Sequence, residues 1–210
     1  MDIELSTEQR DAQEQFRAFA QVEIAPFADQ YDRDEALPTE LIKKMGAAGY
    51  LGAVVPAEYG GRAMGAIEFG LLCEEIGRSS ASVISLLTVQ SMVCQALVRW
   101  GSSAQKERWL PRLASGETLA AFGLTEPNVG SDASSVETSA VEGEDEFVLS
   151  GHKQWISCGQ LADVFLIIAQ CEGKPSAFLV EKNCPGLVVE PISGMLGFRS
   201  AMLAKLHMED

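Results

Sequence analysis

Two short segments in the second half of the chain carry residue types that can hold a planar ligand with a polar edge. The first runs from Ala121 to Asp132 and reads AFGLTEPNVGSD; the second runs from Gly151 to Gly159 and reads GHKQWISCG. In the first segment Pro127 fixes one backbone angle, and Gly130 permits a positive φ. Exposed backbone N–H groups in such a loop can bind a diphosphate or the edge of a heteroaromatic ring.

Each segment also has a purely structural interpretation. The first can be a hairpin in which Asn128 and Asp132 cap their own turn. In the second, Trp155 can be a core residue or a wall against a planar ligand, and core is the commoner fate of a tryptophan. Ser157 can donate a hydrogen bond to a ligand or satisfy a local carbonyl. Either segment alone therefore favours the structural interpretation, and only their joint occurrence indicates a site.

The composition is that of a folded protein with an acidic surface. The 210 residues are 47% hydrophobic, which allows one large or two small domains. The net charge of −14 opposes binding to nucleic acid and to an anionic membrane surface. The longest clean apolar run, 164–169, is too short to cross a bilayer, so we expect no membrane insertion.

The cysteines and the N-terminus indicate the compartment. Five cysteines are widely spaced without a CxxC pair, and there are only two histidines. This pattern favours reduced thiols in a cytoplasmic protein over a disulfide framework, and it predicts no metal site. The first residues, Met1–Glu4, show no basic and apolar regions of a signal peptide.

The first half of the chain predicts helices that would support the two segments. Ser6 with Gln9, and Ser102 with Gln105, have the spacing of a capping box at a helix start. Pro38 can open a further helix. Apolar spacing also predicts a helix over 67–76, and the mostly apolar 83–100 stretch is typical of a helix buried on most sides.

After about Gly116 the pattern changes to short runs of β-branched and aromatic residues separated by turns. Strands are predicted at 147–149, 164–168, 177–180 and 187–189, with a turn at 183–186. Regular short strands without intervening helices predict a small antiparallel β-barrel or sandwich. The expected fold is therefore α+β, with an all-α N-terminal domain at 1–117 and a β domain at 118–210 that carries both segments.

The order of the motifs resembles that of the acyl-CoA dehydrogenases. LTEPNVGSD at 124–132 and GHKQWIS at 151–157 are similar to the two flavin-binding stretches of that family. VPAEYGG at 55–61 resembles the family's loop between early helices. GFRS at 197–200, leading into LHMED at 206–210, resembles its closing β-domain strand. Together these motifs extend the resemblance over essentially the whole chain.

The resemblance implies FAD held between the helical domain, the β domain and a C-terminal helical bundle, across a subunit interface. The implied cofactor-binding residues are Phe122, Leu124, Thr125, Gly130, Ser131, Trp155, Ile156 and Ser157. Trp155 would flank the isoalloxazine ring, and Ser157 would offer its hydroxyl near flavin N5. The family more often has threonine at that position, and serine keeps the donor. Ser131 would also approach the acyl thioester.

The implied reaction is α,β-dehydrogenation of an acyl thioester carried by coenzyme A or by an acyl carrier protein. An electron-transfer flavoprotein would accept the electrons, and the enzyme would be a homodimer or homotetramer. The implied base is a glutamate of the C-terminal helical domain, and no residue up to Asp210 matches it. Glu126 fits a turn better than a catalytic role. No catalytic residue is therefore assigned, and the chain is expected to be an incomplete enzyme.

Three alternatives stay open at this point. The stretch at 197–203, GFRSAML, is similar to dehydrogenases that oxidise small acids bound to a carrier protein, although the acidic charge counts against an acidic carrier. A flavin oxidase or monooxygenase would share the fold. A non-catalytic module that binds an acyl group or a partner would keep the fold without the chemistry.

Overall fold

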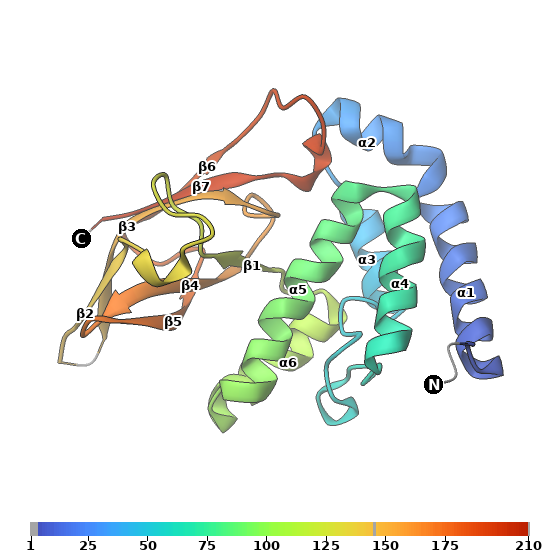
Figure 1. The fold of residues 1–210 in the computed structure, drawn as a ribbon, viewed down its shortest axis with the longest axis horizontal. Helices are drawn as coiled ribbons and strands as arrows, with labels where there is room; N and C mark the ends of the chain where they lie inside the picture. Colours follow the sequence, from blue (N-terminus) through green and yellow to red (C-terminus); the bar gives the residue numbers. More distant parts are fainter. Residues whose placement is uncertain (1–3, 145, 210) are drawn as a thin grey trace. The chain divides into compact units, whose positions relative to one another are not determined.

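The computed structural model describes residues 4–144 and 146–209, and it divides into two compact units. The first unit comprises residues 1–117 and 196–201, and the second comprises 118–195 and 202–210 (Figure 1). The interpretations that rest on Met1–Ile3 and on Asp210 lie outside the described residues. The chain thus leaves the second unit once, contributes a short segment to the first, and then returns.

The first unit is helical. Its α-helices are α1 (Thr7–Glu23), α2 (Ala28–Asp34), α3 (Thr39–Ala47), α4 (Ala66–Ser79), α5 (Ala81–Trp100) and α6 (Ser103–Ser115). Short 3-10 helices are η1 (Ala25–Phe27), η2 (Ala57–Tyr59) and η4 (Arg199–Ala201). Both predicted capping boxes are present, at Ser6 with Gln9 and at Ser102 with Gln105. Each box satisfies two backbone N–H groups that the first helical turn leaves without partners.

Helix α5 forms the centre of the helical unit. It is the one helix among the described residues that is long and apolar enough to cross a membrane, yet 56% of its apolar stretch is buried inside the protein. Its polar Gln90 is also buried, and the side-chain amide donates to the Leu113 carbonyl of α6 at 2.9 Å. The helix is therefore a core element, as its sequence predicts.

A buried carboxylate joins α1 to α4. Glu75, whose side chain is 2% exposed, accepts hydrogen bonds from Arg17 Nη2 at 2.9 Å and from Gln13 Nε2 at 2.9 Å. The hydrogen bond from Arg17 is the main reason that the pKa of Glu75 lies below its ordinary value. The pair links two helices that have no other ionic contact of this depth among the residues described.

The segment 196–201 is bound to α2 of the same unit. The Arg199 backbone N–H donates to Asp32 Oδ1 at 3.0 Å, and its guanidinium donates to the Asp32 carbonyl at 3.0 Å. Arg199 Nε also lies 3.6 Å from Glu35 Oε1. These contacts give the GFRS motif a structural role in anchoring the excursion between two strands of the second unit.

The second unit is a curled mixed β-sheet. Its strands are β1 (Ala120–Gly123), β2 (Ser139–Glu142), β3 (Phe147–Ile156), β4 (Val164–Cys171), β5 (Lys174–Glu181), β6 (Leu187–Pro191) and β7 (Ala204–Met208). The order is β1-β4-β2-β3-β7-β6, and β5 pairs with β4. A short 3-10 helix, η3 (Ala133–Ser135), lies between β1 and β2. The predicted fold, a helical domain followed by a small β domain, is confirmed.

The sheet differs from a purely antiparallel one in two pairings. Strands β1 and β2 both run parallel to β4, whereas the pairs β2–β3, β3–β7, β4–β5 and β6–β7 are antiparallel. Parallel neighbours need a long connection, and about forty residues separate β1 from β4. Because it has partners on both edges, β4 is almost continuously buried from Val164 to Ala169.

Loss of the Arg17 partner is expected to destabilise the protein in a pH-dependent way. Arg17→Met leaves the Glu75 carboxylate buried, so the free energy of unfolding at pH 7 should fall by about 1–3 kcal/mol. The folded-state pKa of Glu75 is depressed, so the stabilisation is present above the unfolded-state value of 4.5 and disappears as the pH falls through the folded-state pKa. Urea unfolding at pH 7 and at successively lower pH measures both effects.

The matched control is Arg10→Met, because Arg10 and Glu4 are 60% and 81% exposed. An exposed pair contributes little, so this variant should unfold within about 0.5 kcal/mol of the unmodified protein. Equal losses in the two variants at pH 7 would contradict the role assigned to Arg17.

Candidate flavin-binding site

The structure brings the two sequence segments together in the β unit. The first segment continues from β1 and the second forms the end of β3. The Gln154 backbone N–H donates to the Thr125 carbonyl at 2.8 Å, and Lys153 Nζ donates to the Leu124 carbonyl at 3.2 Å. The two segments are thus joined by a direct backbone hydrogen bond.

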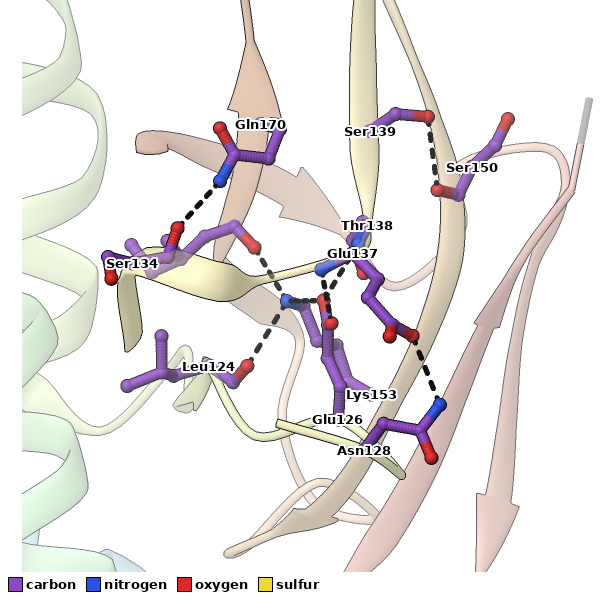
Figure 2. A network of polar contacts seen from close by, with 11 residues as sticks. Leu124, Glu126, Asn128, Ser134, Glu137, Thr138, Ser139, Ser150, Lys153 and Gln170 are labelled. Atoms are coloured by element: carbon purple, nitrogen blue, oxygen red, sulfur yellow. Dashed lines mark hydrogen bonds and ion pairs between the residues drawn. The ribbon is translucent and has the colours of Figure 1, made fainter. Parts of the chain in front are cut away.

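A buried ion pair lies beneath this junction. Lys153 Nζ is 2.7 Å from Glu126 Oε1, and the two side chains are 0% and 1% exposed. Figure 2 shows that the pair connects the two segments, with Lys153 reaching from β3 towards Leu124 and Glu126. The carboxylate of Glu126 also accepts from the backbone N–H groups of Glu137 and, at 2.9 Å, of Thr138.

The environment shifts the pKa of both members of this pair. Burial works to raise the pKa of Glu126, but hydrogen bonds from Lys153 and from the backbone N–H groups outweigh it and leave the pKa below its ordinary value. Burial lowers the pKa of Lys153, and Glu126 opposes that shift. Glu126 is therefore a fully hydrogen-bonded, ionised carboxylate.

A β-bulge turns Trp155 out of the sheet. In the pairing of β3 with β7, Lys153 lies opposite Leu206 and Ile156 lies opposite Ala204. The interval on β3 is therefore one residue longer than the interval on β7, which defines the bulge. Trp155 takes up the extra residue with φ of +59°, a left-handed conformation that is rare for a bulky side chain. The side chain is 52% exposed. A strained backbone that presents a large aromatic surface to solvent is typical of a ligand-binding position.

The other predicted cofactor-binding residues fall into three groups. Phe122, Leu124, Thr125 and Ser157 are partly exposed, and Ile156 is 1% exposed and belongs to the core. Gly130 and Ser131 are exposed in the following loop. In the part of the chain that the structure describes, no hydrogen bond from a protein group reaches the hydroxyls of Thr125, Ser131 or Ser157.

The loop after Glu126 differs in one respect from its sequence interpretation. Gly130 does not adopt a positive φ, and a Cβ added there would meet nothing within 4 Å. The turn is closed instead by reciprocal backbone hydrogen bonds between Glu126 and Val129. Asp132 stabilises the loop locally, because its carboxylate accepts from the hydroxyls of Ser134 and Ser135 at 2.6 Å each. The structural interpretation of Asp132 therefore applies.

Sequence reasoning missed the ion pair. Lys153 received no role, although it alternates along β3 with the exposed His152 and so lies on the inward face of the strand. The sequence did contain a signal for this ion pair: a lysine at an inward strand position and a glutamate in the other motif. Cys158, next to Ser157, is fully buried, and burial raises its pKa to about 12, which excludes a nucleophilic thiolate.

The arrangement offers groups that a planar heteroaromatic ring could use. Trp155 exposes an indole face, and the hydroxyls of Thr125 and Ser157 come from the two joined segments and have no protein partners among the described residues. Over residues 4–144 and 146–209, no cluster of three or more His, Cys, Asp or Glu side chains is arranged to hold a metal ion.

Comparison with known proteins agrees with this geometry. The chain matches the family model for the acyl-CoA dehydrogenase N-terminal domain over residues 6–117, and the model for the middle domain over residues 121–210. The chain belongs to the acyl-CoA dehydrogenase family. Residues 6–117 thus correspond to one domain of that family and residues 121–210 to another, and both candidate segments fall in the part that matches the middle domain.

Individual relatives match along the whole chain. Acryloyl-CoA reductase (NADH) from Anaerotignum propionicum is 38% identical over 100% of this chain and 55% of its own length. Glutaryl-CoA dehydrogenase from Mycobacterium smegmatis, solved in complex with FADH2, has a TM-score of 0.93 and 33% identity over 98% of this chain and 53% of its own. A structure reported for the electron transferring flavoprotein of Acidaminococcus fermentans has a TM-score of 0.94, 32% identity, and 100% and 57% coverage. The chain therefore spans about half the length of the relatives it matches.

Replacement of Trp155 is expected to leave folding almost unchanged. Trp155→Gly removes an exposed side chain and relieves the left-handed backbone, while glycine adds entropy to the unfolded chain, so the free energy of unfolding should change by less than about 1 kcal/mol. Trp109, which is 5% exposed, is the control. Trp109→Ala should cost about 3–5 kcal/mol in urea unfolding of the ligand-free protein. A comparable loss for Trp155→Gly would mean that the indole is a core support instead of a ligand wall.

Proposed function

We propose that this chain forms the flavin-binding part of an FAD-dependent oxidoreductase that removes two hydrogens from the α and β carbons of an acyl thioester. The observation that carries the proposal is the junction of Thr125 and Gln154, which sets an exposed tryptophan and two hydroxyls without protein partners beside one another. The likeness to a glutaryl-CoA dehydrogenase in complex with FADH2 supports FAD as the ligand.

The residues fit an isoalloxazine ring. Trp155 would cover part of one ring face and keep water from it, and Phe122 and Leu124 would add apolar surface. Thr125 and Ser157 would hydrogen-bond to the polar edge through their hydroxyls, and Gly130 and Ser131 would lie along the cofactor. Bound FAD would supply the hydride acceptor, while the protein would set its orientation and electronic environment. Ile156 would contribute only through its backbone, because its side chain is buried.

The substrate part of the site is less complete in this chain. Ser131 would approach the thioester, whose carbonyl must be held by hydrogen bonds as negative charge develops on it. Glu126 does not act as the base, because its carboxylate is buried and already accepts three hydrogen bonds. No catalytic residue is therefore proposed within the described residues.

Coenzyme A is the favoured carrier. An acyl carrier protein is acidic, and docking it would require an accessible basic group. The only basic residue in the 197–203 stretch, Arg199, is engaged with Asp32 and Glu35. The likeness to an acryloyl-CoA reductase supports a short acyl-CoA, although that relative is named for the reduction of such a thioester.

A redox partner, an oligomeric state and a cellular location are proposed as well. A structure reported for an electron transferring flavoprotein contains a chain of the same fold as this one, which supports such a flavoprotein as the redox partner. A homodimer or homotetramer and a cytoplasmic location are the expected states, and the five free cysteines support a reducing compartment. The net charge of −14 argues against nucleic acid as a partner.

The test is anaerobic reduction of the FAD-loaded protein in a form that includes the C-terminal helical domain expected to supply the base; the isolated 210-residue chain should not be reduced by an acyl-CoA. Butyryl-CoA should bleach the visible flavin absorbance, and Ser157→Ala should slow this bleaching by about tenfold, because the loss of one hydrogen bond to the flavin costs on the order of 1.4 kcal/mol. Ser176→Ala, in β5, is the control and should bleach at the unmodified rate. Equal rates in all three proteins would remove Ser157 from the proposed site.

The same preparation separates the alternative functions. A protein that takes up no FAD would support the non-catalytic module and contradict the proposal. Rapid reoxidation of the reduced flavin by air would favour an oxidase or monooxygenase. Bleaching by an acyl carrier protein thioester but not by the acyl-CoA would reverse the assignment of the carrier.

A further inference from the structure

The geometry points to Lys153 and Glu126 as a positioning pair that sets the spacing between the two flavin-binding segments and so controls how the flavin lies against Trp155. The inference rests on the proposed function and goes beyond it, because neither residue is expected to touch the cofactor. It assigns the pair a role in orientation, distinct from a role in stability.

All the protons of the Lys153 ammonium have acceptors. They are donated to Glu126 Oε1 at 2.7 Å, to the Ile168 carbonyl at 2.6 Å and to the Leu124 carbonyl at 3.2 Å. An ammonium has three N–H donors, so its capacity is filled. The acceptors come from the turn, from β4 and from the continuation of β1, and the lysine therefore fixes β3 against three different parts of the unit.

The Glu126 carboxylate extends the connection to β2. One oxygen accepts from Lys153 and from the Thr138 N–H at 2.9 Å, and the other accepts from the Glu137 N–H (Figure 2). Residues 137 and 138 lead directly into β2. The turn 126–129 is thus closed by the backbone hydrogen bonds between Glu126 and Val129, and the Glu126 carboxylate fixes it to the start of β2.

Together these bonds join the stretch 124–126 to residues 153 and 154 of β3. Leu124 and Glu126 are bonded to Lys153, while Thr125, between them, is bonded to the backbone of Gln154. Thr125 and Trp155 therefore hold fixed positions relative to each other. A shift of Lys153 along β3 would carry Trp155 with it, because the bulge begins at the next residue.

Stability alone gives no reason to keep such a pair. Removing two charges from water is costly, and well-packed neutral residues of similar shape are often equally stable in place of a buried ion pair. Directional bonds from one ammonium to three carbonyl or carboxylate oxygens, in contrast, specify a single arrangement of the backbone. A ring clamped between two segments needs that precision more than it needs additional stability.

The test replaces both charges with neutral residues of similar shape. In Lys153→Met with Glu126→Gln, the glutamine oxygen can accept from one of the two N–H groups that bond to the native carboxylate, so the apo protein should keep cooperative unfolding at reduced stability. FAD affinity, measured by titration, should fall by about tenfold or more. At saturating FAD, quenching of flavin fluorescence by Trp155 should weaken, and a purely structural role would not change this quenching in a folded variant.

The control is Arg17→Met with Glu75→Gln, which removes the buried ion pair of the helical unit. It should alter stability but leave both FAD affinity and flavin fluorescence unchanged. If the double variant of Lys153 and Glu126 does not fold, Glu126→Gln alone serves as the test, because it keeps the lysine and neutralises only its partner. This single variant should show a smaller loss of affinity and of quenching in the same direction.

The outcomes separate the inference from the proposed function. Absence of FAD binding in the unmodified protein would overturn the proposed function and, with it, this inference. FAD binding in the unmodified protein with the same affinity and fluorescence in a folded Lys153 and Glu126 variant would overturn the positioning role only. Equal losses in the control pair would also overturn it, because the effect would then follow general stability.

Discussion

A lysine ammonium that is shielded from water persists only where each of its protons has an acceptor, and this requirement organises the β unit. Lys153 fulfils it with one carboxylate and two backbone carbonyls from separate elements. The strand that carries the lysine must therefore lie at one depth and in one register relative to β1 and β4. The register of β3 in turn sets where its bulge occurs, and the bulge decides that Trp155 faces solvent.

The helical unit also contains a buried charged group, but its ionic partner is only partly buried. Its buried carboxylate, Glu75, has a partner that is itself 45% exposed, so half of that ion pair remains hydrated. Such a pair stabilises the contact between α1 and α4 without demanding a unique backbone arrangement. The two ion pairs thus differ in role. The half-exposed Arg17 stabilises a helix contact, whereas the fully buried Lys153 specifies the arrangement of the backbone around it.

Local sequence signals predicted most of the secondary structure. Contacts between residues far apart in the sequence, such as strand pairings, could not be predicted in the same way. Capping boxes and apolar spacing depend on neighbours a few residues away, and the helices at α1 and α6 began where these signals placed them. The strands β1 and β2 run parallel to β4, and no local pattern distinguishes a parallel from an antiparallel partner. The site residues emerged from the resemblance of two motifs; the ion pair joining those motifs depends on a contact across 27 residues, which spacing alone does not reveal.

The bonding that positions Glu126 also removes it from the chemistry. A general base must have a free lone pair directed at the substrate and must gain a proton during the reaction. Glu126 directs its oxygens at Lys153 and at two backbone N–H groups, and these donors lower its pKa, so protonation would cost more than for an ordinary carboxylate. In the proposed site, Glu126 thus holds the two segments in place and takes no part in proton transfer. Position in a motif therefore indicates proximity to the site, and only the hydrogen-bond partners of a residue indicate its role.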